Sequence, residues 1–441
     1  MVVSREKTPT AQETFLQMAQ AAGLRGRLLI TIGLLILIRF GIFIPIPGIN
    51  RTEFARAISN SPVLGFLDIF TGGGISTLGI FALGILPFIN ASIIMQLLTA
   101  AIPALEDLQK NEGEAGRRKI SQITRYVAAG WSVIQSTAIT IGLLRPYALG
   151  DPFWFVPETV LALTAGSMFV MWVSELITER GIGNGASLLI FVNIVASLPR
   201  TLGQTIDYAQ TGGRQAVAQV VILLLVFLVM IVGIVFVQEG TRRIPIISAR
   251  RQVGRKLYRE RTSYLPLRLN QGGVMPIIFA SAVLILPQSL LSFVSNQESV
   301  SPVAQALIAV TNALSPGSWA YVGVYSLLIL FFSYFYASLI VNPEDVSKNL
   351  KKMGSSIPGI RPGEKTKQYL EGVLNRLTFL GAIFLSFVAT VPTLVERATQ
   401  VSTFQGLGAT SLLILVGVAI DTAKQIQTYV ISQRYEGMIK Q

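Results

Sequence analysis

Ten runs of predominantly apolar residues, most of them long enough to cross a membrane, recur along this chain of 441 residues. A membrane-spanning helix needs about 20 such residues, and a helix satisfies its own backbone hydrogen bonds in lipid. The runs lie near residues 28–46, 77–103, 124–144, 157–177, 187–205, 215–237, 274–295, 319–341, 375–395 and 409–430. The sequence therefore predicts an all-α polytopic membrane protein with ten transmembrane helices and both termini on the same side.

Basic residues are distributed unevenly between the segments that join these runs. Of the 36 Lys and Arg residues, 29 fall in segments assigned to one side of the membrane and six in loops assigned to the other. Lys and Arg accumulate on the cytoplasmic side, so the bias places both termini in the cytoplasm. The predicted organisation is a cytoplasmic segment (1–27), two halves (28–205 and 206–430) and a cytoplasmic tail (431–441).

The chain contains no Cys and no His. This composition excludes disulfides, thiolate nucleophiles, His-ligated metals and a His general base. Two glycine-containing segments, 181–186 and 363–366, resemble nucleotide-binding motifs by letter, but neither follows a predicted strand. We therefore expect no catalytic site, no metal and no cofactor, and any energy input must come from a partner.

One apolar stretch, residues 66–96, is interrupted where a simple span would be continuous. Gly72, Gly73 and Gly74 separate a short amphipathic piece, expected to end at Phe70, from an apolar helix that follows. Irregular backbone at membrane depth occurs only inside protein or beside a water-filled cavity, so this stretch is predicted to line a cavity. Weaker interruptions before the fifth and seventh runs are typical of repeat-built transporters and channels. A secondary transporter of a small solute is the alternative to a channel.

Arg39 lies inside the first apolar run. An intramembrane charge costs about 2.5–3.5 kcal/mol on insertion scales. A structural ion pair with an acidic residue, or a side chain that reaches a membrane interface, explains it most simply. A role in a pore or gate is the alternative.

Two loops, 238–268 and 342–376, carry more positive charge than orientation in the membrane requires. Their length and their Pro and Gly residues indicate projecting docking elements for RNA phosphate or an acidic protein surface. Orientation bias together with attraction to anionic lipid explains the same charges. Composition does not choose between these explanations.

Six stretches of the chain closely resemble the SecY family, which supplies the central subunit of the bacterial and plastid Sec protein-conducting channel. They are IPIPGI at 44–49, SIIMQLLTA at 92–100, EGEAGRRKISQ at 112–122, ITERGIGNGASLLIF at 177–191, RRIPIISARR at 242–251 and PGIRPGEKT at 358–366. The resemblance implies two pseudo-symmetric five-helix halves around an hourglass pore with a plug. It further implies that unfolded secretory polypeptides cross through the pore, and that membrane-protein helices leave through a lateral gate between the second and third and the seventh and eighth spans.

Carried over position by position, the resemblance assigns residues to four parts of such a channel. The pore ring falls on Ile85, Ile89, Ile190, Ile278 and Ile414, and Ala186 stands where some relatives have a bulky aliphatic residue. The plug, within about 62–77, falls on Asp68, Ile69, Phe70, Thr71, Gly72, Gly73, Gly74, Ile75, Ser76 and Thr77. The polar pair of the lateral gate is Gln96 and Asn270. The docking residues for the ribosome and SecA are Arg250, Arg251 and Arg361 with their basic neighbours Arg242, Arg243, Arg255, Lys256 and Lys348.

The same resemblance implies the partners and the membrane. The partners are SecE, usually SecG, the SecA motor or the ribosome, whose rRNA the cytoplasmic loops would contact, signal peptides and nascent polypeptides, and anionic lipids. The location is the bacterial plasma membrane or the thylakoid membrane. Independently, an aliphatic ring resists ion passage by dewetting, and three consecutive glycines make the plug a poor helix.

Overall fold

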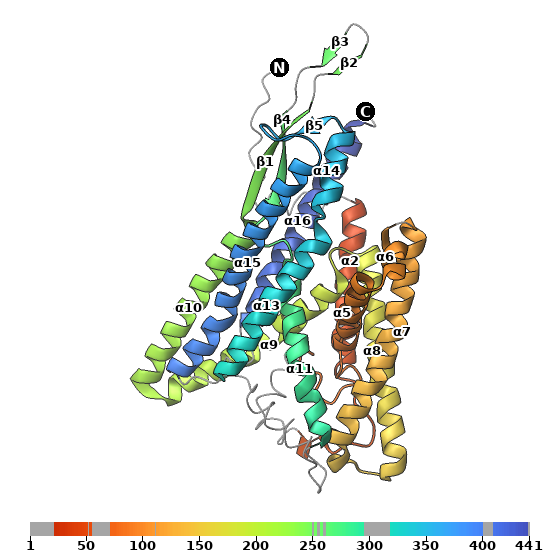
Figure 1. Cartoon of the computed structure of the whole chain (residues 1–441). Helices are drawn as coiled ribbons and strands as arrows, with labels where there is room; N and C mark the ends of the chain where they lie inside the picture. The colour runs from red at the N-terminus through yellow and green to blue at the C-terminus, as the bar shows by residue number, and fades with distance from the viewer. Residues whose placement is uncertain are drawn as a thin grey trace. The chain divides into compact units, whose positions relative to one another are not determined.

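The computed structural model describes residues 22–51, 53–54, 71–110, 112–248, 251–253, 256–258, 262–294, 318–399 and 409–439. Helices dominate this part of the chain (Figure 1). The long apolar helices are α2 (Ala22–Gly41), α5 (Leu86–Ala101), α7 (Gly113–Ile139), α8 (Pro152–Arg180), α9 (Gly185–Thr211), α10 (Gly213–Glu239), α11 (Met275–Val294), α13 (Trp319–Ile340), α15 (Glu364–Thr399) and α16 (Ala409–Ile439). Each overlaps one of the ten apolar runs, and the fold class of a helical polytopic membrane protein is confirmed.

Among the described residues, six helices are long and apolar enough to cross a membrane. The bent pair formed by α5 and α6 (Pro103–Lys110), with an angle of 105° between its two parts, is a seventh candidate. Helix α2 is not among these six. Every stretch of 18 residues within it contains three charged side chains, those of Arg25, Arg27 and Arg39, which is too many for a membrane-spanning helix by this measure.

The chain forms two compact units. The first comprises Met1–Leu202, Gln288–Gln305 and Val418–Gln441, and the second comprises Gly203–Pro287 and Ala306–Gly417. Within the first unit α7 packs against α5 and α8, and α2 packs against α8. Within the second unit α15 packs against α10 and α13. The division into halves at residue 205 stays a prediction.

The second apolar run is helical over a shorter length than predicted. Residues 71–85 form successive turns, and α5 begins only at Leu86. Gly84 has φ +54°, which lies outside the right-handed helical region, and Pro87 suits the first turn of a helix because its missing N–H needs no acceptor there. The predicted start of this helix at residue 77 is therefore wrong. The amphipathic piece expected before the glycines lies outside the described residues.

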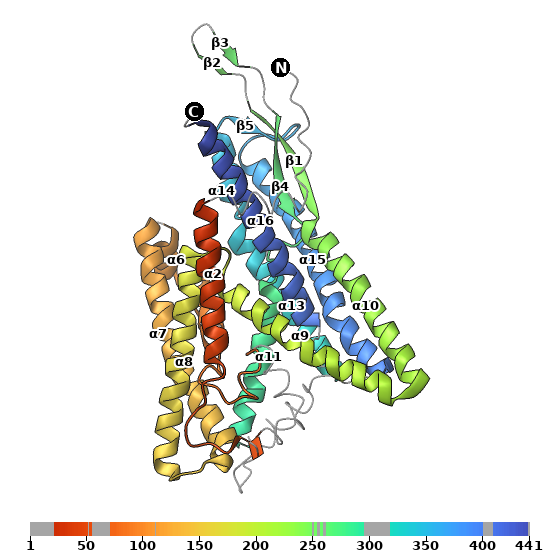
Figure 2. The same ribbon diagram turned by 180° about the vertical axis from the view of Figure 1, so that it is seen from behind.

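A small sheet in the second unit was not predicted from the sequence. β1 (Thr241–Ser248) pairs antiparallel with both β4 (Thr262–Arg268) and β5 (Ser355–Ser356). β2 (Arg251–Val253) and β3 (Lys256–Tyr258) form a two-stranded ribbon that lies beyond β1 and β4 in both views (Figures 1 and 2). With α14 (Pro343–Lys352), these strands give both long loops regular structure.

The sheet has an apolar side that packs against helices of the same unit. Ile244 and Ile246 on β1 are buried while Pro245 between them is exposed, which is the two-residue alternation of a strand covered on one face. Ile244 and Leu267 share one core with Ile357, Leu370, Val373, Leu374 and Leu377. The two long basic loops therefore contribute to a hydrophobic core within their own unit.

Candidate functional site

The turn segment 71–85 follows the stretch of chain that leaves α2. The N–H of Ile80 donates to the carbonyl of Ile44, and the N–H of Ile46 donates to the carbonyl of Leu78, both at 2.9 Å. These reciprocal bonds resemble a short piece of sheet. They hold the segment in place although it is not a helix.

Apolar side chains of the same segment are enclosed by protein. Ile75, Leu78 and Leu83 belong to a buried cluster that also contains Ile46 and Phe54. Enclosure inside protein is one of the two situations in which irregular backbone occurs at membrane depth, and the cavity-lining role of this stretch stays a prediction. Of the predicted plug, residues 71–77 lie in this segment, whereas Asp68, Ile69 and Phe70 lie outside the described residues.

Arg39, near the end of α2, contacts the glycine break. Its Nη1 donates to the carbonyl oxygen of Gly72 at 2.6 Å, a contact that the sequence-based alternatives did not include. A Cβ on Gly72 would lie 2.5 Å from Oδ1 of Asn193 and 2.6 Å from Nη1 of Arg39. Asn193, buried in α9, was missed from the sequence. Its signal is an amide within an apolar span, where polar side chains are costly and usually functional.

All five predicted ring isoleucines are buried, each with at most 7% of its surface exposed. Ile85 and Ile89 lie one turn apart at the start of α5, where the N–H of Ile89 donates to the carbonyl of Ile85 at 3.1 Å. Ile190 on α9 belongs to the first unit, and Ile278 on α11 and Ile414 on α16 belong to the second. A ring made by all five stays a prediction.

The predicted polar pair of the lateral gate consists of one residue from each unit. Oε1 of Gln96, on α5, is buried and has no hydrogen-bond partner in the described part of the chain. Nδ2 of Asn270 donates to the carbonyl of Gly273 at 2.7 Å and so orders the turn before α11. Their pairing across a gate stays a prediction.

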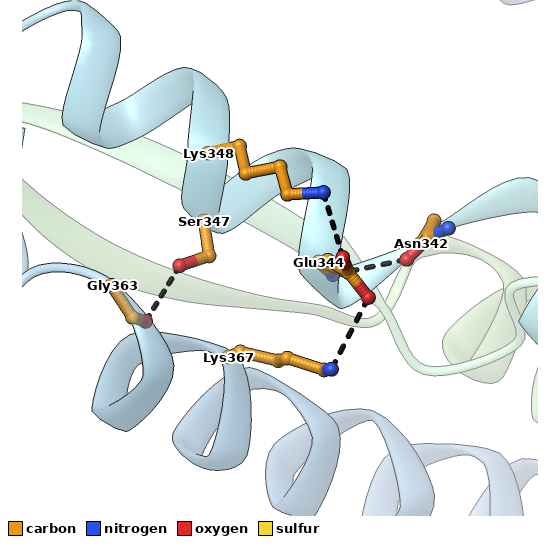
Figure 3. A network of polar contacts seen from close by, with 6 residues as sticks. All are labelled: Asn342, Glu344, Ser347, Lys348, Gly363 and Lys367. Carbon is orange, nitrogen blue, oxygen red and sulfur yellow. Dashed lines mark hydrogen bonds and ion pairs between the residues drawn. The ribbon is translucent and has the colours of Figure 1, made fainter.

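In the second unit, an ion-pair network holds α14 against the start of α15 (Figure 3). Oδ1 of Asn342 caps α14 by accepting from the N–H of Glu344 at 3.0 Å. Nζ of Lys348 and Nζ of Lys367 donate to the Glu344 carboxylate at 2.7 and 3.2 Å. Hydrogen bonds from these two lysines, with their positive charges, lower the pKa of Glu344.

Two further hydrogen bonds fix the loop that precedes α15. The hydroxyl of Ser347 donates to the carbonyl of Gly363 at 2.7 Å (Figure 3). The hydroxyl of Thr366 donates to the carbonyl of Arg361 at 2.9 Å. The exposed Arg361 is thus presented on an ordered backbone.

The structure brings several of the predicted docking residues into one unit. Arg242 and Arg243 are exposed on β1, and Lys348 is exposed on α14 beside Glu344. Arg251 lies on β2 and Lys256 on β3. Arg250 and Arg255 lie outside the described residues.

These features define a multi-pass membrane protein with the fold of a protein-conducting channel. The solved structure titled "The structure of a protein conducting channel" has a TM-score of 0.63, with 92% of each chain covered at 17% identity. A structure titled "Sec61 in the Canine ribosome-channel complex from the endoplasmic reticulum" has a TM-score of 0.60 and covers 92% of each chain at 16% identity.

Residues 79–423 match the SecY family. The chain is 80% identical over 441 residues, covering all of both chains, to "Protein translocase subunit SecY" of Synechocystis sp.. The chain belongs to the SecY family and is a subunit of a protein translocation channel. These findings support the channel and not the solute transporter.

Proposed function

We propose that this chain forms the pore through which unfolded secretory polypeptides cross a membrane and from which membrane-protein helices leave through a lateral gate. The observation that carries the proposal is the match to a curated protein translocase subunit, 80% identical along the whole of both chains. The turn segment 71–85 agrees with it, because irregular backbone at membrane depth occurs only inside protein or beside a water-filled cavity.

The proposed seal is an aliphatic ring with a plug beneath it. Buried isoleucines oppose ion passage by dewetting and present no fixed charge to a moving polypeptide. The ring consists of Ile85, Ile89, Ile190, Ile278 and Ile414, the plug of residues 68–77, and the polar pair of the lateral gate of Gln96 and Asn270.

The exposed basic surface of the second unit is proposed to dock the ribosome or SecA. Arg242, Arg243 and Arg361 stand on the sheet and on the loop fixed by Ser347. Arginine attracts RNA phosphate and acidic protein surfaces alike. A ribosome-bound channel among the fold neighbours agrees with this assignment. SecE and SecG are the proposed membrane companions, and signal peptides, nascent polypeptides and anionic lipids the other partners.

The proposed location is the bacterial plasma membrane or the thylakoid membrane, with both termini in the cytoplasm. The bias of basic residues supports the orientation. The match to a Synechocystis protein supports a cyanobacterial membrane.

The decisive experiment is reconstitution of the full chain, with its companion subunits, SecA and ATP, in proteoliposomes, scored by uptake of a signal-peptide-bearing precursor. Arg361→Glu should abolish uptake without loss of the protein from the membrane, because reversed charge repels a docking partner. Arg214→Glu reverses the charge of another exposed arginine, at the start of α10, and is the matched control. No uptake by the unmodified channel would overturn the proposal.

Planar-bilayer current tests the seal separately. Replacing Ile85 and Ile278 by Ser should wet the constriction and raise ion leakage. Val226→Ala and Val229→Ala on α10 should leave conductance unchanged, since the proposal places them away from the pore. Equal leakage from both sets would mean that the pore is lined by other helices.

A further inference from the structure

We propose that Arg39 is a positioning residue for the plug. Its guanidinium, together with Asn193, holds Gly72, the first glycine of the break. This contact determines how often the plug is displaced in the resting channel. The inference rests on the proposed role of residues 68–77 as a plug. It assigns a purpose to a charge within an apolar span.

The contact joins two parts of the chain that are distant in sequence. Nη1 of Arg39 lies 2.6 Å from the carbonyl oxygen of Gly72, 33 residues further along the chain. Gly72 is buried, and Thr71 before it is 1% exposed. Residues 71–85 are not helical, so a buried carbonyl that accepts no bond within their turns needs a donor from elsewhere. A guanidinium carries five donors and no acceptor, so it suits this task.

Gly72 also has the geometry of a tightly enclosed position. Its φ is +67°, and the added Cβ of any other residue would collide with both Asn193 and Arg39. Gly73 provides an internal comparison, because its φ is +89° but a Cβ there would meet only Oγ of Ser76, at 3.8 Å. Substitution of either glycine would strain the backbone, because both have a positive φ. Only Gly72 lies between the side chains of Arg39 and Asn193.

The consequence follows from the kind of bond. A hydrogen bond from a charged donor is about twice as strong as one between neutral groups, and a partly buried bond such as this one is screened less by salt than an exposed one. Displacement of the plug therefore requires that the strong hydrogen bond between Arg39 and Gly72 be broken. Weakening that contact should raise the resting open population without affecting the docking of partners.

The test uses the full chain, purified with its companion subunits, in planar bilayers. Arg39→Gln and Gly72→Ala should each raise resting conductance several-fold. Arg39→Lys should lie between wild type and Arg39→Gln, because an ammonium donates to a carbonyl but lacks the planar fork. Gly73→Ala should leak less than Gly72→Ala.

Plug position is read independently by a single Cys at Ser76, since the chain has no natural Cys. An impermeant maleimide should modify Ser76→Cys faster in the Arg39→Gln background. Adding Arg39→Gln to a channel that lacks residues 68–77 should cause no further leakage. If Arg39→Gln instead damaged the fold in general, the leakage caused by the substitution would add to the leakage caused by the deletion.

The possible outcomes distinguish a failure of the plug assignment from a failure of the role proposed for Arg39. No leakage from deletion of residues 68–77 would overturn the plug and, with it, the role of Arg39. Leakage from the deletion, with unchanged conductance and labelling in Arg39→Gln, would overturn the role of Arg39 alone. If Arg39→Gln fails to accumulate in the membrane, equal conductance of Gly72→Ala and Gly73→Ala would overturn it.

Discussion

The turn segment 71–85 and the proposed docking sheet both interrupt the succession of apolar helices, but different interactions stabilise them. The name docking sheet covers β1, β4 and β5 together with the neighbouring helix α14. The sheet has ladder hydrogen bonds and its own hydrophobic core around Ile244 and Leu370. The turn segment has neither a helix nor a long ladder. Hydrogen bonds within its turns are joined by bonds from Arg39 and the chain after α2, and its apolar side chains share a cluster with Ile46 and Phe54. A part stabilised by a long ladder and a core withstands contact with partners, whereas a part built of turns, with few ladder bonds, opens locally at lower cost.

The largest expected effect is the loss of the core beneath the docking sheet. Leu370→Ala removes a side chain that is 1% exposed, and such truncations cost about 2–5 kcal/mol. Hydrogen exchange of β1 and β4 amides should accelerate strongly, while exchange in α8 stays unchanged. Asn375→Ala, an exposed position on the same helix, is the control. Equal protection in both variants would show that the sheet does not depend on this core.

The second effect tests how closely the turn segment fits its neighbours. A Cβ at Gly79 would overlap the carbonyl oxygen of Ile42, and overpacking of this kind costs about 1–3 kcal/mol. Gly79→Ala should displace the segment and raise resting conductance while the helices remain. Gly33→Ala on α2, where nothing lies within 4 Å, should leave conductance unchanged. Identical currents in the two variants would mean that the segment accommodates the added methyl group without being displaced.

The helices could be predicted from the sequence because they depend on local pattern, whereas the site assignments stay predictions. An apolar run dictates a helix in lipid, and the positions of Ile85 and Ile414 follow from motif resemblance. The start of α5 could not be placed this way. Residues 77–85 are apolar enough for a helix, and their turn geometry depends on contacts with Ile44 and Ile46, which lie more than 30 residues earlier.

The docking sheet was missed for a different reason. The alternation in β1 is only a few residues long, it includes Pro245, and a run of arginines surrounds it. Proline normally disfavours a strand, and basic charge dominated the interpretation of the loop. The core that stabilises the strands comes from α15, more than 100 residues later. Asn193 was missed because the partner that gives it meaning, Gly72, is remote in sequence.

The third effect is smaller and concerns the loop that presents Arg361. Ser347→Ala removes the hydroxyl that donates to the carbonyl of Gly363 at 2.7 Å, and a hydrogen bond of this kind contributes about 0.5–1.5 kcal/mol. Protease cleavage of the 357–363 loop should quicken and precursor uptake should fall. Ser338→Ala, an exposed serine bonded within its own helix, is the control. Unchanged cleavage would show that the ion pairs alone hold α14 in place.

The smallest effect concerns those ion pairs, and it depends on pH. The two lysines hold the pKa of Glu344 below its ordinary value of 4.5. The carboxylate is therefore favoured in the folded loop, so its stabilisation is fully present above pH 4.5 and is lost as the pH falls through the lowered pKa. Lys348 and Lys367 have raised pKa values, so their share is lost only in alkali, as the pH rises through those values.

Glu344→Gln tests this dependence directly. Because Lys348 is exposed and Glu344 and Lys367 are partly exposed, the loss at pH 7 should be smaller than for Ser347→Ala. It should also shrink in high salt, which screens exposed charges. Protease resistance of the 357–363 loop should fall between pH 5 and pH 3 in the wild type but not in the variant. Glu114→Gln, which breaks a comparable exposed pair with Arg118 in the other unit, should retain the wild-type profile. A variant as acid-sensitive as the wild type would show that other carboxylates control the acid stability of the docking sheet. The hydrophobic core would then be the main difference between the docking sheet and the turn segment.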